Sequence, residues 1–174
     1  MKTILKPAAI LTAVCLLVTL AVAGVNGLTR DAIAKSEAAA AQASMAALIP
    51  GTDFTPVDAD CESDEVYRAE DKGYIFVSAA TGYGGDVKVM TALDREGVVL
   101  GVIVLSCDDE TPGLGQNCKK ASFTDQFAGK SGSVELTKNG GEIVAVTSAT
   151  YTSTAVKTCV NRALADYKIV KEGA

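Results

Sequence analysis

The 174-residue sequence contains no histidine. Imidazole-based catalytic triads and histidine-ligated metal sites are therefore excluded. The chain also lacks a CxxC pair and a carboxylate-rich calcium loop. It has no block of Lys or Arg and carries a formal charge of -5, so nucleic acid is not expected as a partner. We predict neither catalytic residues nor a metal site, and any chemistry should belong to a cofactor.

The longest uncharged run covers Ala8–Leu28, which is the length of a membrane-spanning helix. Lys2 and Lys6 precede it, so the positive-inside rule places the N-terminus in the cytoplasm and the rest of the chain on the outer face. The alternative is a signal peptide cleaved after the small residues Ala21–Ala23. We favour a retained single-pass anchor because the run continues past that site to spanning length. Both interpretations export the remainder.

Four of the five cysteines, Cys61, Cys107, Cys118 and Cys159, follow the apolar run. Outside the cytoplasm they permit two disulfides in three possible pairings, of which Cys107–Cys118 closes the shortest loop. Four free thiols are the alternative.

An alanine-rich segment follows the anchor. Thr29 can cap a helix over residues 30–48, which Pro50 and Gly51 would end. We therefore predict an anchor over residues 1–28, a helical stalk over 29–50 and a folded domain over 51–174.

The domain shows alternating strand and turn signals, which predict an α+β fold with a mainly antiparallel sheet packed with helices. Apolar strand-like runs cover residues 66–70, 74–80, 87–93 and 98–106, and a short helix is expected over 123–130. A hairpin is expected from residues 134–138 and 142–148 around an Asn-Gly-Gly turn. The last helix should run from Thr150 to Lys171 and bury Val156, Val160, Leu164 and Tyr167.

Six Ser and Thr residues crowd into VTSATYTSTAV, residues 146–156, where a strand is expected to end and a helix to begin. A helix N-terminus presents unpaired N–H groups and the positive end of the helix dipole, and so suits a phosphate group. The alternative is that these residues are ordinary helix caps.

A second unusual segment, DDETPGLGQN at residues 108–117, follows the most apolar strand. It lacks the Gly-Lys-Ser/Thr ending of a Walker loop. By composition alone it could be an acidic surface loop.

Together these motifs resemble one family. GYGG at residues 82–85, ETPGLG at 110–115 and TSATYTS at 147–153, with the short N-terminal anchor, are similar to the G subunit of Rnf complexes (RnfG). They are also similar to the C subunit of sodium-pumping NADH:quinone reductases (NqrC). The resemblance covers nearly the whole chain. The short length of this chain favours RnfG, because NqrC chains are longer.

The resemblance implies an FMN-binding domain with a covalent flavin. In this family a threonine ending an (S/T)GAT motif is joined to the FMN phosphate by a flavin transferase that uses FAD and Mg²⁺. Here that residue is Thr150. Ser148 stands where the motif usually has Gly, and Val144 where the transferase signature usually has Asp. The neighbours implied in the site are Thr147, Ser148, Ala149, Thr152 and Ser153, with Thr147, Thr152 and Ser153 as fallback acceptors.

The family's ETPGLG loop lies beside the flavin. By that analogy Glu110, Thr111, Gly113, Leu114 and Gly115 form a wall of the site, and Tyr83 contributes from the GYGG turn.

The implied function is an electron-transfer subunit of a membrane-bound ferredoxin:NAD⁺ oxidoreductase that translocates Na⁺ or H⁺. Its partners would be the other Rnf subunits, the transferase and the membrane. The alternatives are an exported scaffold or binding module that has lost its flavin, or an FMN shuttle for extracellular electron transfer.

Overall fold

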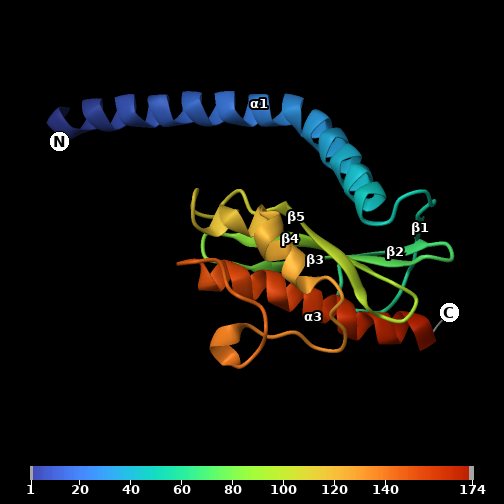
Figure 1. Ribbon diagram of the computed structural model, residues 1–174. Coiled ribbons are helices and arrows are strands. Elements are labelled where there is room, and N and C mark those ends of the chain that lie inside the picture. The colour runs from blue at the N-terminus through green and yellow to red at the C-terminus, as the bar shows by residue number, and fades with distance from the viewer. Residues whose placement is uncertain (1, 173–174) are drawn as a thin grey trace. The chain divides into compact units, whose positions relative to one another are not determined.

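The computed structural model describes residues 2–172 of the chain, which divides into two compact units, Met1–Gln42 and Ala43–Ala174. One helix, α1 (Lys2–Leu48), supplies most of the first unit and ends in the second (Figure 1). The expected start of a second helix at Thr29 is wrong. Thr29 lies inside α1, where its hydroxyl donates to the Val25 carbonyl oxygen at 3.0 Å instead of capping a new helix.

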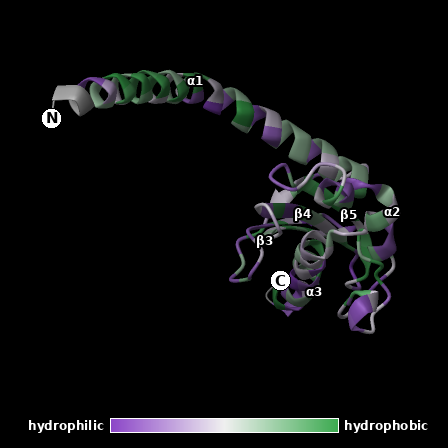
Figure 2. Cartoon of the chain, turned by 90° about the vertical axis from the view of Figure 1, so that its left-hand side faces the viewer, coloured by the Kyte–Doolittle hydropathy of each residue, from purple (hydrophilic) through white to green (hydrophobic). Residues whose placement is uncertain are grey.

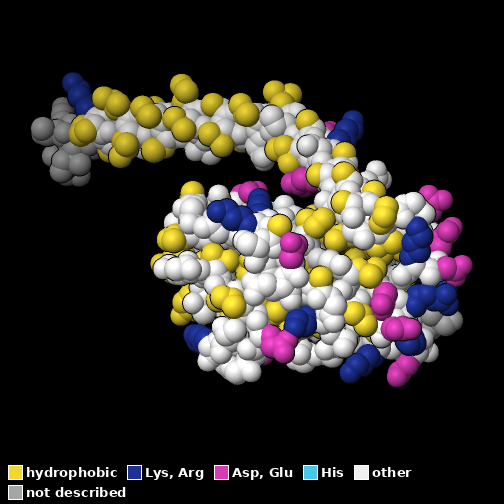
Figure 3. All heavy atoms as spheres, in the orientation of Figure 1, with side chains coloured by type: hydrophobic (Ala, Val, Ile, Leu, Met, Phe, Trp, Pro, Cys, Tyr) yellow, Lys and Arg dark blue, Asp and Glu magenta, His cyan; other side chains and the backbone are white. Residues whose placement is uncertain are grey.

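By length and composition, α1 is suited to cross a membrane, as the sequence predicts. Figure 2 shows its N-terminal part as almost uniformly hydrophobic, and Figure 3 shows charged side chains only towards the ends of that stretch. Because the anchor and the stalk form one unbroken helix, the boundary between them stays a prediction.

The second unit is built on a five-stranded antiparallel sheet in the order β1-β2-β3-β4-β5, which confirms the expected fold class. Each strand pairs with its neighbour in sequence, as the closely spaced turn signals indicated. The strands are β1 (Thr55–Pro56), β2 (Glu65–Ala69), β3 (Gly73–Thr81), β4 (Asp86–Leu93) and β5 (Val99–Ser106).

Helix α3 (Thr150–Glu172) packs along one face of this sheet, against β3 and β4 (Figure 1). Its buried stripe is the one expected from the 3.6-residue period and includes Val156, Val160, Leu164 and Tyr167. These side chains share one apolar core with Phe76, Val89 and Leu93 of the sheet.

The opposite face of the sheet is buried as well. Ile75 pairs with Ala92 and Val77 with Met90, and all four side chains are at most 1% exposed. Met45, near the end of α1, and Ile49, the residue after the helix, are buried too, at 4% and 3% exposure. Leu48 also approaches so closely that a Cβ on Gly101 would lie 2.8 Å from its Cδ2 atom. The sheet therefore lies between two helical layers.

The hairpin expected over residues 134–148 is wrong. The segment contains a 3-10 turn, η3 (Thr137–Asn139), and a single bridge between Leu136 and Ile143. At that bridge Thr137 N donates to Ile143 O at 2.9 Å and Ile143 N donates to Glu135 O at 3.1 Å. At the start of the segment, Asn161 of α3 accepts from Val134 N at 2.8 Å and donates to Val134 O at 2.9 Å. Backbone pairing is thus confined to one bridge, and a helix side chain bonds Val134.

The short helix expected over residues 123–130 is a chain of three shorter turns that begins earlier. They are η1 (Gly115–Lys119), α2 (Ala121–Thr124) and η2 (Asp125–Phe127). Phe123 and Phe127 anchor them in the core, with ring centroids 5.5 Å apart.

Candidate cofactor site

The ETPGLG segment forms a compact loop between β5 and η1. The carbonyl oxygen of Thr111, an exposed residue, accepts the amides of Leu114 and Gln116 at 3.1 and 3.3 Å. Gly113 has a φ of +77°, a conformation that glycine adopts without strain. The loop therefore turns tightly and exposes Leu114, which is 42% accessible.

Glu110 ties this loop to two other segments and is only 2% exposed. One carboxylate oxygen, Oε1, accepts the amides of Tyr83 and Gly84 at 2.6 and 3.4 Å. The other, Oε2, accepts the hydroxyl of Thr152 at 2.8 Å. A single carboxylate therefore joins the GYGG turn, the ETPGLG loop and the start of α3.

Two glycines of the motifs make room for that carboxylate. A Cβ on Gly82 would lie 2.1 Å from Glu110 Oε1, and one on Gly115 would lie 2.3 Å from Oε2. Glu110 and Gly115, expected in a wall of the site, therefore lie beneath the loop and support it.

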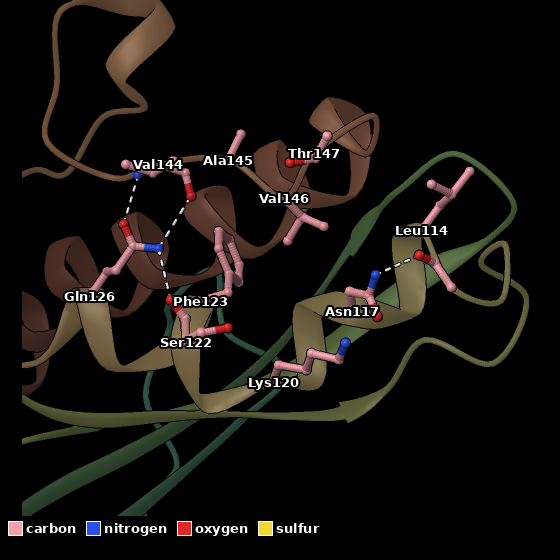
Figure 4. A pocket seen from close by; sticks show the side chains of 11 residues that line it. Leu114, Asn117, Lys120, Ser122, Phe123, Gln126, Val144, Ala145, Val146 and Thr147 are labelled. Atoms are coloured by element: carbon pink, nitrogen blue, oxygen red, sulfur yellow. Dashed lines mark hydrogen bonds between the residues drawn. The ribbon is translucent and has the colours of Figure 1, made fainter.

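A cavity of about 660 Å³ lies between this loop, the short helices and the segment that leads into α3 (Figure 4). Its volume is in the range of small-molecule and cofactor sites. Its lining combines apolar with neutral polar side chains and one cation. The lining residues are Gly113, Leu114, Asn117, Lys120, Ser122, Phe123, Gln126, Val144, Ala145, Val146 and Thr147.

The two amide side chains of this lining hold the backbone in place. Gln126 accepts from Val144 N at 2.8 Å and donates to Val144 O at 3.2 Å (Figure 4). Asn117 donates to the carbonyl of Gly113. The backbone at Val144 and at Gly113, on two sides of the cavity, is therefore held by hydrogen bonds within the protein itself.

Helix α3 begins beside this cavity, at Thr150. The Thr150 side chain is half-buried, and its hydroxyl makes no hydrogen bond with any part of the chain that the structure describes. The first amides of the helix have no partner within the helix and carry the positive end of its dipole. Thr150 thus presents a free hydroxyl at a place that favours an anion.

The turn before Thr150 explains a feature of the motif. Ser148 has a φ of +59°, in the left-handed region that glycine prefers. The Ala149 amide then donates to Val146 O at 3.0 Å and closes the turn. Ser148 therefore bears strain that Gly at this position would avoid.

Two other hydroxyls of the cluster serve the fold. Ser153 is fully buried; its Oγ accepts from Val146 N and donates to Ala149 O, both at 2.9 Å. Thr152 is 1% exposed and bonds Glu110. In this conformation both point into the protein, and the Thr152 hydroxyl bonds a carboxylate on another segment instead of capping α3.

Tyr83 does not line the cavity. It is 74% exposed and lies beside Tyr151, which is 71% exposed, with ring centroids 6.2 Å apart.

Of the residues predicted from sequence, Gly113, Leu114 and Thr147 line the cavity. Ser148, Ala149 and Thr150 follow Thr147 in the chain and are not among the lining residues. Sequence reasoning missed eight lining residues, although all lie within eleven positions of a recognised motif. They are Asn117, Lys120, Ser122, Phe123, Gln126, Val144, Ala145 and Val146.

Cys107 and Cys118 lie at the two ends of the ETPGLG loop and are both fully buried thiols in this structure. Burial, followed by the contact with Cys107, raises the pKa of Cys118 to about 12. The proximity of these two thiols suits the pairing that the sequence suggested, and a Cys107–Cys118 disulfide stays a prediction.

Comparison with known proteins identifies the family. Residues 82–165 match the FMN-binding domain, and residues 1–48 match the RnfG N-terminal region. The chain is 30% identical over 164 residues to the G subunit of the proton-translocating ferredoxin:NAD(+) oxidoreductase complex of Clostridium ljungdahlii, covering 88% of this chain and 86% of that one. It belongs to the RnfG family, the G subunits of these complexes.

Two further matches are consistent with this family assignment. The G subunit of the Na(+)-translocating ferredoxin:NAD(+) oxidoreductase complex of Acetobacterium woodii is 36% identical over 116 residues, covering 60% of this chain but only 55% of that relative's length. The crystal structure of the C subunit of the Na(+)-translocating NADH-quinone reductase from Parabacteroides distasonis has a TM-score of 0.51 at 24% identity, covering 62% of this chain and 61% of that one. This second match shows a shared fold.

The cavity of this RnfG-family protein fits the FMN that its domain family binds. Leu114, Phe123 and Val146 offer apolar surfaces for a flat ring. Thr147 of the lining and the first amides of α3, which begins three residues later, offer donors for a phosphate.

Proposed function

We propose that this RnfG-family protein carries FMN esterified through its phosphate to Thr150, and that it transfers electrons within an ion-translocating ferredoxin:NAD⁺ oxidoreductase. The names of the Clostridium and Acetobacterium relatives support the assignment to such a complex. The match to the FMN-binding domain supports the cofactor. The two relatives are named for different ions, H⁺ and Na⁺, so the proposal covers either.

One observation supports Thr150 as the attachment point. In the first turn of α3 the Thr150 hydroxyl is half-accessible and unpaired within residues 2–172, whereas Thr152 and Ser153 are buried and bonded. The hydroxyls of Thr147 and Ser148 are exposed and likewise unpaired among these residues, but they precede the helix. The chain needs no base of its own, because a flavin transferase would activate the reaction. Thr150 has only to be reachable and to hold the product phosphate at the helix N-terminus.

The bound FMN would supply reversible uptake of electrons. The chain would orient the ring between Leu114 and Phe123 and keep the phosphate at the start of α3. Gln126 and Glu110 would hold the walls at a fixed separation through their backbone hydrogen bonds. None of these roles requires an acid or a base.

The proposed location follows from α1. This helix would span the membrane with the N-terminus in the cytoplasm, because Lys2 and Lys6 precede the apolar run. The FMN-binding domain would then lie on the outer face, where the other subunits of the complex would be its electron-transfer partners.

The test is intact mass, together with in-gel flavin fluorescence after denaturation, of the full chain made alongside a flavin transferase. We expect one FMN on the wild type and on Thr147→Val, and none on Thr150→Val. Flavin on Thr150→Val would move the acceptor to another hydroxyl. No flavin on any of the three, with a control substrate modified, would contradict the proposal.

That last result would favour an exported scaffold that has lost its flavin. Two departures motivate this second candidate: Val144 replaces the usual Asp of the transferase signature, and Ser148 replaces the usual Gly. Val144 is 59% exposed, so it could be read directly by a transferase.

A further inference from the structure

Lys120 is the one charged residue in the lining of the cavity. The other ten lining residues are uncharged, and four of them, Leu114, Phe123, Val144 and Val146, are large and apolar. In Figure 4 the Lys120 side chain lies below that of Asn117, with Ser122 on its other side. A positive charge thus lies against the space that we assign to the flavin.

This charge has no acidic partner among the residues that the structure describes. The Lys120 ammonium group makes no hydrogen bond or ion pair within the described part of the chain. Its neighbour Lys119 contrasts with it, because the Lys119 Nζ atom lies 3.0 Å from Asp108 Oδ1. Lys130 and Lys157 are likewise paired with glutamates. Lys120 is therefore available to a ligand in the cavity.

We propose that Lys120 faces the redox-active ring and raises its reduction potential by stabilising the negative charge that reduction adds. This inference rests on the proposed function. On full reduction the ring takes up two electrons from a low-potential donor and one proton from water, and so gains one negative charge. Lys120 stays protonated throughout and donates no proton.

The effect should be moderate because the cavity is open to water. Lys120 is exposed, and the walls of the cavity at Leu114 and Val144 are 42% and 59% exposed. At a separation of a few ångströms and a partly aqueous effective dielectric, a full charge changes an equilibrium roughly tenfold. The ratio of reduced to oxidised flavin at a fixed ambient potential should change by that factor.

The experiment is a potentiometric titration of the full-length flavinylated protein, with dithionite as the electron donor and mediator dyes, followed by flavin absorbance. Lys120→Gln should hold roughly tenfold less reduced flavin than the wild type at the wild-type midpoint. Lys120→Arg keeps the charge and should stay near the wild type. The difference between Lys120→Gln and the wild type should shrink as salt is added, because salt screens exposed charges.

Lys138→Gln is the matched control. Lys138 is also exposed and its ammonium group has no partner among the described residues. It is not part of the cavity lining, and its loss changes the net charge equally. We expect no shift from this variant.

Three results would overturn the inference. A Lys120→Gln midpoint equal to that of Lys138→Gln would show that the charge does not act on the ring. Reduced flavin loading in Lys120→Gln with an unchanged midpoint of the loaded fraction would assign the charge to the phosphate or to maturation. A wild type without flavin, detected by fluorescence before titration, would overturn the proposed function and this inference with it.

Discussion

The Thr152 hydroxyl donates a 2.8 Å hydrogen bond to Glu110 Oε2, and this contact joins the first turn of α3 to the ETPGLG loop. Both side chains are at most 2% exposed. The second oxygen of the same carboxylate holds the GYGG turn. The three motifs that suggest the family thus meet at one buried carboxylate below the cavity.

Removing that carboxylate should destabilise the domain. Glu110→Ala leaves the Thr152 hydroxyl buried without a partner and removes the acceptor of the Tyr83 amide, so we expect a loss of about 3 kcal/mol in the free energy of unfolding. Thr152→Val should cost about 1 kcal/mol because Tyr83 stays bonded. Chemical denaturation of the full chain in detergent measures both. Glu96→Gln is the control, because Glu96 is exposed and its carboxylate has no partner among the described residues.

The double variant that combines Glu110→Ala with Thr152→Val shows whether the two substitutions remove one shared contact or act on stability separately. If Glu110 and Thr152 stabilise the fold through their mutual bond, the losses should fall short of additivity by about 1 kcal/mol. Full additivity would contradict the coupling.

The left-handed backbone of Ser148 predicts opposite effects for two substitutions. Ser148→Gly removes the Cβ strain, so stability should stay equal or rise by up to about 1 kcal/mol, and flavin loading should not fall. Ser148→Val places a β-branched side chain at a φ of +59° and should cost about 2 kcal/mol.

Thermal unfolding of the same full-length chains measures this pair. Ser133→Val is the control, because Ser133 is exposed and its φ is not positive. Equal effects of Val at both positions would show that Ser148 is unstrained.

The buried thiol of Cys118 predicts a dependence of stability on alkaline pH. Its pKa is raised from 9.0 to about 12, so the folded state keeps a proton that the unfolded state releases. The contribution of the protonated Cys118 thiol to the free energy of unfolding is therefore complete below about pH 9, and it is lost as the pH rises towards 12.

Unfolding free energies measured at pH 8, 9 and 10 under reducing conditions test this dependence. Between pH 9 and 10 the wild type should lose up to about 1.4 kcal/mol more than Cys118→Ala. Cys15→Ala, which changes a cysteine of α1, should follow the wild type. Parallel curves for wild type and Cys118→Ala would contradict the prediction.

The antiparallel meander and α3 could be predicted from sequence because their signals are local. Turn residues separate the apolar runs of β3, β4 and β5, and the stripe from Val156 to Tyr167 has helical spacing. The same local logic gave a wrong hairpin after Val134. An Asn-Gly-Gly turn is a strong signal, but the segment pairs through a single bridge at Leu136 and Ile143. Asn161, from a distant part of the chain, takes both backbone bonds of Val134, where the first strand was expected to begin.

Local sequence signals were limited in the same way at the candidate site. The motifs located the loop and the start of α3, and so found Leu114 and Thr147. They did not reveal that Glu110 points inward, because its partners Tyr83 and Thr152 come from 27 and 42 residues away. Lys120 belongs to no motif, and two structural features distinguish it from Lys119: it lines the cavity, and it lacks the ion pair that Lys119 makes with Asp108.

Because the end of α1 packs on the sheet, it limits where this protein can be truncated. Sequence patterning places the start of the folded domain at residue 51, but a fragment starting there would lack Met45 and Ile49. Ile75, Val77 and Met90 would then become a water-exposed apolar sheet face, which favours self-association. A soluble fragment should therefore begin at or before Ala43, so that the membrane helix contributes its last turns to the folded domain.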